Sequence, residues 1–481
     1  MTRLLSLSIR GYTSTKFLTI ISIVISVLIV DISLSNLSDI IDTSTPGGIT
    51  TFIAIALAYA IGQYLILQFV KQKSNTIRIK SPHFDKLRTI ITIVQYILTA
   101  VIVIVILQTL ANSYYYTSLL IYNSTISYSV ACFLILVLAL KFFSWYKLNR
   151  NLVVLSYGIA SILISVSIVS SLVFFNATLL GLPTKINPPT QPVMGHKEAG
   201  LESASEHALE EHKEAGHGPD VRLFNQSTML GKVQIVFAIF HVFSFLSLWA
   251  STVLLLHTYS QKLGKAKFWV IISIPLALYV SVFVTITPFV QSFPNANSST
   301  FRIADVLGYI VPAISSSILF GLPFWMIART MNYDNSLKDY LIIASSGLVL
   351  LQLAWTGNVI LASYPPFGFA SVSFVGLSSY LILMGIYSST ISISTDQKLR
   401  KSIKKYVIEE YRLLDSIATA QMEQDIQNIV VKVVEANLGK TKERTDIEAL
   451  IKEEDVREYL HDVLSEIYAA KNKERAGNID S

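Results

Sequence analysis

Ten apolar stretches of similar length restrict what this chain can fold into more than any other feature. They are Phe17–Leu34, Gly48–Val70, Ile90–Leu110, Ser127–Tyr146, Leu152–Phe174, Gln234–His257, Phe268–Phe289, Ala304–Met326, Tyr340–Leu361 and Phe367–Ser389. Each has roughly the 20 residues that a helix needs to cross a membrane, whereas a spanning strand needs about 9–11 alternating residues. Because lipid offers the backbone no hydrogen-bond partner, the expected fold class is all-α: a polytopic membrane helix bundle with about ten transmembrane helices.

Lys and Arg orient these segments, because connections rich in them are held in the cytoplasm. They gather in every second connection, counting for one of these the span end before it, which holds Lys141: Lys71, Lys73, Arg78, Lys80, Lys86 and Arg88; Lys141, Lys147 and Arg150; Lys262, Lys265 and Lys267; Arg329 and Lys338. The short connections between these groups contain Arg302 alone. The sequence therefore predicts a multi-pass protein of the cell membrane with both termini in the cytoplasm.

Sequons of the type N-x-S/T give a second indication of orientation. They occur at Asn36, Asn123, Asn176, Asn225 and Asn297, and all five fall in segments predicted to face outward. A glycan acceptor is expected on a surface of the secretory side. A Ser/Thr/Asn-rich sequence can also produce sequons by chance, so the use of these sites is left open while their placement favours the same topology.

The chain divides into four parts on composition. Residues 1–175 hold the first five spans, 176–231 form a polar insert outside the cytoplasm, 232–392 hold the other five spans, and 393–481 form a cytoplasmic tail of two helices. Apolar residues recur at helical spacing in the tail: Leu399, Ile403, Val407, Leu414, Ile417, Ala418, Met422, Ile426, Ile429 and Val433. Leu438-Gly439 resembles a helix end, Gly439–Arg444 a hinge, and Thr445–Glu448 the start of a second helix. The apolar faces are expected to pack on each other, on a second copy of the chain, or on a partner.

Metal binding is weighed at the insert, where four of the eight histidines lie at His196, His207, His212 and His217. Imidazole suits Zn and Cu. However, His207 and His212 are five residues apart, whereas two ligands on one helix face are normally four apart. No dedicated metal site is therefore expected. Cys132, the single cysteine, excludes a disulfide within the chain and a Cys-based metal site.

Ionisable residues inside a membrane are costly and often functional. His241 lies about a third of the way into its span. Three roles are weighed for it: a proton carrier, a ligand contact or, more commonly, a neutral ring that is hydrogen-bonded to a neighbouring helix. Four others lie near span ends and are expected to reach the interface: Asp31, Lys141, His257 and Asp305. The seventh span contains Pro275 and Pro288, and the eighth contains Gly308, Pro312, Gly321 and Pro323, so both are candidates for the broken helices of transporters.

No nucleotide-binding, hydrolase or metalloprotease motif occurs in the chain, so no catalytic, cofactor-binding or metal residue is assigned and an enzyme is not expected. Nor does the net charge of +6 indicate a nucleic-acid partner, because the basic residues are spread over the connections and the tail. As a whole the chain resembles the Ile/Ser/Thr-rich polytopic membrane proteins of unknown role that are common in archaea.

Three classes of function remain. A receptor-like or signal-relay protein passing a signal to the cytoplasmic tail accounts for the tail, the insert and the scarcity of membrane charge. A transporter or channel for a small solute accounts for the number of spans. A scaffold that recruits a partner complex accounts for the tail alone. The expected partners are the lipid bilayer and, through the tail helices, a second copy or a cytoplasmic protein.

Overall fold

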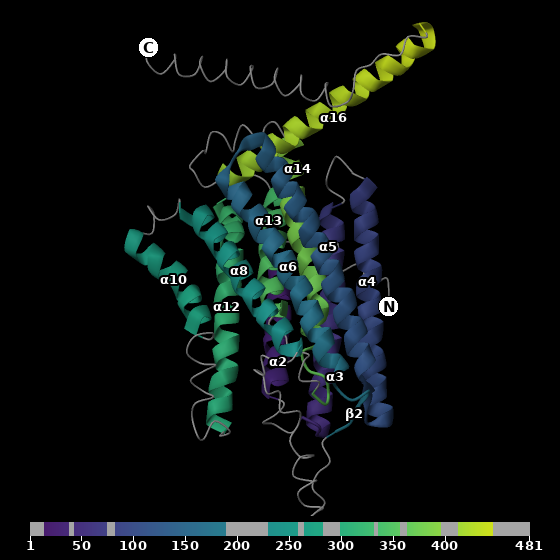
Figure 1. Ribbon diagram of the computed structural model, residues 1–481, viewed down its shortest axis with the longest axis vertical. Helices are drawn as coiled ribbons and strands as arrows, with labels where there is room; N and C mark the ends of the chain where they lie inside the picture. The colour runs from purple at the N-terminus through teal and green to yellow at the C-terminus, as the bar shows by residue number, and fades with distance from the viewer. Residues whose placement is uncertain are drawn as a thin grey trace, which may run out of the picture. The chain divides into compact units, whose positions relative to one another are not determined.

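The computed structural model describes residues 14–37, 43–74, 82–188, 229–257, 264–281, 299–330, 335–355, 363–395 and 412–445. Within these ranges lie eleven helices and one two-stranded ribbon, so the all-α fold class is confirmed (Figure 1). The helices are α2 (Ser14–Leu37), α3 (Pro46–Ser74), α4 (Pro82–Asn112), α5 (Thr117–Asn149), α6 (Leu152–Leu180), α8 (Met229–Leu256), α10 (Lys265–Ser281), α12 (Ser299–Thr330), α13 (Asn335–Trp355), α14 (Phe369–Thr395) and α16 (Arg412–Thr445). The strands are β1 (Tyr115–Tyr116) and β2 (Lys185–Ile186), which pair antiparallel.

Nine of these helices, all except α10 and α16, are long and apolar enough to cross a membrane. The seventh predicted span corresponds to α10, which has 17 residues and ends at Ser281. The remainder of that predicted span, residues 282–289, lies outside the described ranges. The chain is therefore an integral multi-pass membrane protein whose described helices follow the predicted segments.

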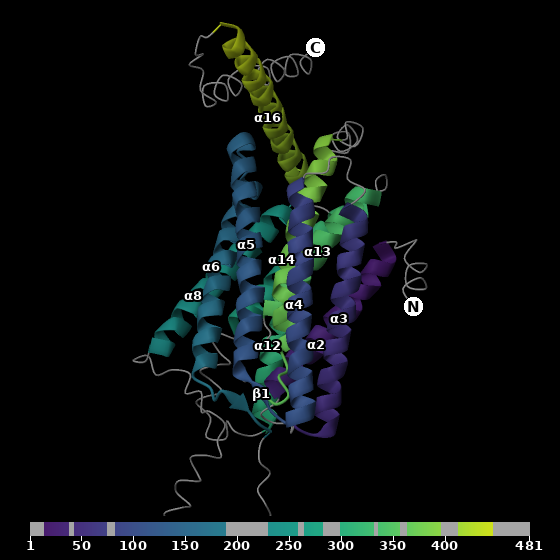
Figure 2. The same cartoon turned by 90° about the vertical axis from the view of Figure 1, so that its right-hand side faces the viewer.

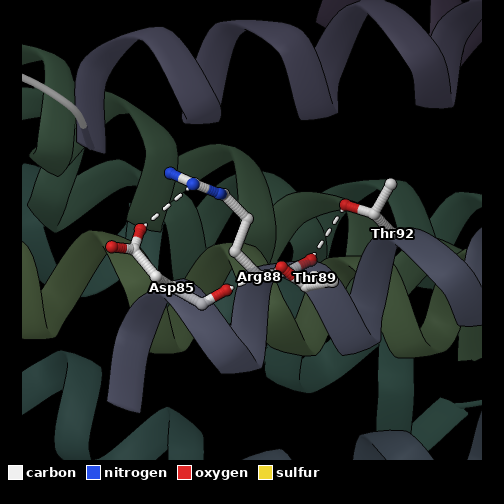
Figure 3. A network of polar contacts seen from close by, with 4 residues as sticks. All are labelled: Asp85, Arg88, Thr89 and Thr92. Carbon is white, nitrogen blue, oxygen red and sulfur yellow. Dashed lines mark hydrogen bonds and ion pairs between the residues drawn. The ribbon is translucent and has the colours of Figure 1, made fainter. Parts of the chain in front are cut away.

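Helix α4 shows how the spans extend beyond their apolar stretches. It begins at Pro82, eight residues before the first apolar residue of the predicted span, and proline is favoured in the first turn because it has no N–H to leave unpaired. Asp85, in the same turn, favours the positive end of the helix dipole. Arg88 reaches back to Asp85 with 3.0 Å between Nη2 and Oδ1, as Figure 3 shows. The Thr89 and Thr92 hydroxyls donate to backbone carbonyls one turn earlier.

The eighth predicted span is not broken: α12 runs without interruption through Pro312 and Pro323. Each proline removes the N–H that would donate to the carbonyl four residues earlier, and membrane helices tolerate this loss. Serine hydroxyls bond to other carbonyls near the two prolines: Ser315 donates to the Pro312 carbonyl at 3.0 Å, and Ser345 of α13 donates to the Gly321 carbonyl at 2.8 Å. Helix α10 likewise continues through Pro275, whereas Pro288 lies outside the described ranges.

Contacts divide the chain into two compact units. The first contains residues 1–141 and 156–389, and the second contains residues 142–155 and 390–481. Helices α5, α6 and α14 contribute residues to both units. The second unit therefore joins the turn between α5 and α6 to the C-terminal segment, two regions that the sequence placed in different parts of the chain.

Within the first unit, α14 lies among the other helices (Figure 2). The apolar stretch of α14 is completely buried, whereas only 28% of the apolar stretch of α4 is buried. Helix α14 therefore lies in the core. Two glycines let α13 and α14 approach closely. A Cβ added at Gly385 would lie 2.4 Å from the backbone nitrogen of Ala344, and one added at Gly347 would lie 2.7 Å from that of Ile382.

At one end of the first unit, connections that the sequence predicts to lie together on the outer side of the membrane contact each other. We call this the ribbon end, because β1 and β2 lie there. The Tyr115 hydroxyl donates to the Ser363 carbonyl at 2.8 Å, and the Thr43 hydroxyl donates to the Tyr364 carbonyl at 2.9 Å. Tyr364 in turn donates to the Thr109 carbonyl at 3.2 Å. Burial raises the pKa of Tyr115 well above its usual value, which keeps its phenol a neutral donor.

The connections predicted to lie on the other side also meet each other. Lys73, at the end of α3, forms an ion pair with Asp339, near the start of α13, with 2.5 Å between Nζ and Oδ2. The hydroxyl of Tyr340 donates to the Lys73 carbonyl at 3.0 Å. The pairing of helix ends thus agrees with regular alternation of the spans. The side of the membrane on which each end lies stays a prediction.

Candidate functional site

Two side chains at the end of α5, next to the turn that leads into α6, make contacts with a distant part of the chain. Arg150 adopts a left-handed conformation, with φ at 45°, and its N–H donates to the Tyr146 carbonyl at 2.8 Å. The Asn151 side chain then accepts from the Val153 N–H at 2.9 Å, which caps the start of α6. On the α5 side of this turn, Trp145 and Asn149 are four residues apart and so lie on one face of the helix.

Both of these side chains hydrogen-bond to the first half of α16. The Trp145 indole N–H donates to Gln421 Oε1 at 3.0 Å, and the Asn149 amide donates to the Ser416 carbonyl at 2.9 Å. Trp145 is completely buried and Gln421 is 4% exposed. A hydrogen bond between buried side chains fixes position closely, because either partner left alone would lose its water without compensation. The C-terminal helix is therefore attached to the turn by directional contacts.

Burial along α16 changes at the middle of the predicted apolar stripe. Leu414 and Ile417 are 2% and 1% exposed, whereas Ile426 and Ile429 are 36% and 61% exposed. The apolar stripe is thus covered along the first half of α16, whereas its packing on the other tail helix, a second copy or a partner stays a prediction. Hydrogen bonds to the chain's own α5 end had not been predicted, since the sequence left only the other tail helix, a second copy or a partner as candidates.

The predicted end of the first tail helix is wrong. Helix α16 continues through Leu438 and Gly439 to Thr445, so neither the cap nor the Gly439–Arg444 hinge forms. A glycine inside a helix costs only about 1 kcal/mol relative to alanine, and the Lys, Glu and Arg residues that follow favour a helix. The second predicted tail helix lies outside the described residues.

Asp31 does not reach the membrane interface, contrary to expectation. Its carboxylate is fully buried and accepts from the Gly368 N–H at 2.9 Å, the Ser371 N–H at 2.9 Å and the Ser371 hydroxyl at 2.7 Å. These donors lie at the start of α14, where the backbone N–H groups have no partner within the helix and the helix dipole favours a negative charge. Asp31 therefore acts as a cap supplied by another helix.

His241 lies among aromatic rings from three helices. Its ring is 4.9 Å from that of Trp355, 5.6 Å from Phe237 and 6.0 Å from Tyr279, measured between centroids. Its Nδ1 is buried and has no hydrogen bond within the described part of the chain. The hydrogen bond to a neighbouring helix that we favoured is therefore not observed for this nitrogen, and the roles weighed for His241 stay predictions.

The remaining candidates lie apart from each other. Lys141 is half-buried, with Nζ 5.6 Å from the centre of the Tyr387 ring. His257 is exposed at the end of the described α8 segment, and Cys132 is a half-buried free thiol on α5. The side chain of Asp305 lies outside what the structure describes, as do the four insert histidines, His196, His207, His212 and His217. In the described ranges, no three His, Cys, Asp or Glu residues are grouped as metal ligands.

Two of the sequons are used for helix packing. Asn123 is fully buried on α5, so the surface exposure predicted for it is wrong. Asn176, on α6, accepts from the Ser124 hydroxyl at 3.0 Å and donates to the Thr125 hydroxyl at 2.9 Å. Polar residues of this kind join helices inside membranes. Asn36 donates to the carbonyl of its own helix one turn earlier, whereas Asn225 and Asn297 lie outside the described residues.

A scan against protein-family models and searches of curated proteins and solved structures found no match to this chain. The fold defines an integral multi-pass membrane protein, and any finer function has to be inferred from its own residues.

Proposed function

We propose that this protein is a receptor-like signal relay, in which the state of the membrane helices is passed to the C-terminal helix α16. The observation that carries the proposal is the contact at the α5–α6 turn, where Trp145 and Asn149 hold the first half of α16. The proposal assigns no catalytic step and no cofactor. It places α16 and the rest of the tail in the cytoplasm, in line with the distribution of Lys and Arg.

Two further features support coupling along the chain. Helices α5 and α6 run uninterrupted from the α16 contact to the ribbon end, where β1 precedes α5 and β2 follows α6. A packed helix moves largely as a rigid element, so a shift at one end is carried to the other. Beyond the contact, Ile426 and Ile429 of α16 are exposed. A partner that binds there would respond to a movement of α16.

The test separates attachment of α16 from coupling. In the double variant Leu414→Asp and Ile417→Asp, two buried residues worth about 1.5–3 kcal/mol each would be replaced by charges, which should release the first half of α16. Hydrogen exchange of residues 413–421 is expected to accelerate by roughly 100-fold. Because coupling between two sites is reciprocal, exchange at Tyr115–Tyr116 and Lys185–Ile186 should also change several-fold.

The matched control carries the same charges on the exposed part of the same helix, in Ile426→Asp and Ile429→Asp. This control should leave hydrogen exchange at both places unchanged. If α16 is released but exchange at the ribbon end does not change, the relay is wrong and a scaffold, which needs only the tail, explains the chain better. Unchanged exchange of residues 413–421 in the double variant would show that α16 is not held at these positions. A transporter or channel would instead show solute flux that is independent of α16.

A further inference from the structure

Two polar pairs connect α3 and α4 near the middle of both helices. The Tyr59 hydroxyl donates to Gln95 Oε1 at 3.1 Å, and the Gln63 amide donates to the Thr99 hydroxyl. The partners on each helix are four residues apart, so both pairs lie along one helix–helix contact. Tyr59 and Gln95 are fully buried, and Gln63 is 2% exposed.

Each glutamine uses only half of its amide. Gln63 Oε1 and Gln95 Nε2 are buried, and no hydrogen-bond partner for either exists within the residues that the structure describes. The Thr99 hydroxyl proton is already donated to the Gln95 carbonyl at 2.8 Å, so Gln63 has to present its N–H₂ to Thr99. A buried polar group without a partner costs about 1–3 kcal/mol, which gives this contact a strong affinity for a molecule that can donate and accept.

Two more buried polar groups without a hydrogen-bond partner among the described residues lie on or beside α14, the core helix that packs against Tyr59. Asn123 accepts from Ser373 at 3.0 Å through Oδ1, while its buried Nδ2 has no partner in the described part of the chain. The next residue of α14, Phe374, packs edge-on against Tyr59 with 4.9 Å between ring centroids. Two turns further along α14, the Tyr380 hydroxyl is also buried and, among the described residues, without a partner.

A charged pair, Arg88 and Asp85, lies at the start of α4. Tyr380 lies within electrostatic range of both Arg88 and Asp85. The Asp85 side chain is 48% exposed and the Arg88 side chain 19% exposed. Figure 3 shows the two side chains facing each other. The four residues with unpaired groups, Gln63, Gln95, Asn123 and Tyr380, are all uncharged. The unpaired groups therefore suit a small neutral molecule.

We propose that the contact between α3, α4 and α14 is a binding site for water inside the membrane. One water donates to Gln63 Oε1, one accepts from Gln95 Nε2, and further water bonds to Asn123 Nδ2 and to the Tyr380 hydroxyl. Water fits because it donates and accepts, carries no charge and is the smallest such molecule; buried waters in proteins typically bond to polar groups of this kind. The proposal is independent of the relay function.

The test uses radiolytic hydroxyl-radical labelling of the full-length protein in lipid nanodiscs, because radicals formed from bound water modify the side chains beside it. Tyr59 and Tyr380 are expected to be modified at least about fivefold faster than Tyr115, since a bound water lies within reach of the first two. Tyr115 is the matched control for Tyr59: it is equally buried and its hydroxyl is likewise paired, with the Ser363 carbonyl, but the unpaired amide groups of Gln63 and Gln95 lie at Tyr59. The double variant Gln63→Leu and Gln95→Leu should lower the rate at Tyr59 to that of Tyr115.

The rates in the unaltered protein decide the proposal even if that variant does not fold. Equal modification of Tyr59, Tyr380 and Tyr115 would overturn it. A fast rate at Tyr59 that persists in a folded Gln63→Leu and Gln95→Leu variant would also overturn it, because the water would then not be held by these amides.

Discussion

Gly385→Val is expected to destabilise the helix bundle by about 3 kcal/mol or more, because added atoms in a filled core cost typically 1–3 kcal/mol even when side chains can give way. Here the atom in the way belongs to the backbone: a Cβ at position 385 would lie 2.4 Å from the Ala344 nitrogen. Relief requires α13 and α14 to separate along their length. The free energy of unfolding can be measured by reversible unfolding in SDS–detergent mixtures.

Gly47→Ala serves as the control for this substitution. Gly47 lies in the first turn of α3, and a Cβ there would meet its nearest neighbour, the Thr45 hydroxyl, at an ordinary 3.8 Å. The change should be neutral or stabilising by up to about 1 kcal/mol. If Gly385→Val were as stable as Gly47→Ala, the close approach of α13 and α14 would be wrong.

Asp31→Leu is the second substitution with a large expected effect. It would remove the acceptor of three hydrogen bonds and leave the Gly368 and Ser371 donors buried, at about 1–3 kcal/mol for each group, so we expect a loss of roughly 3 kcal/mol or more. Asp31→Asn keeps one acceptor oxygen and should have an intermediate effect. The same unfolding measurement applies.

Ser33→Ala is the matched control on the same helix, because within the described residues the Ser33 hydroxyl donates to the Ile29 carbonyl of its own helix. Its loss should cost less than about 1 kcal/mol. Equal stability of Asp31→Leu and Ser33→Ala would show that the carboxylate does not cap α14.

The spans could be predicted from the sequence because length and apolar composition alone define them. The contacts between helix ends also agree with regular alternation of the spans, as in the Tyr115 contact with Ser363 and the Lys73 pair with Asp339. These features depend on short segments and their order. They need no knowledge of which side chains face each other.

The contacts that define the candidate site depend on distant residues, and so could not be predicted. Asp31 is 340 residues from Ser371, and Trp145 is 276 residues from Gln421.

The polar contact between α3 and α4 did leave a signal in the sequence. Gln63 and Gln95 stand inside otherwise apolar stretches, where an amide is costly unless another polar group faces it. The prediction at Gly439 failed because a local helix-end signal was weaker than the helix-forming residues on both sides.

The relay requires the insert and the tail to lie on opposite sides of the membrane, and labelling of engineered cysteines in intact cells tests this most directly. In a Cys132→Ser background, Ser205→Cys should react with a membrane-impermeant maleimide, and Lys405→Cys should react only after the cells are opened. Labelling of both positions in intact cells, or of Lys405→Cys alone, would contradict a relay from the outside to the C-terminal helix.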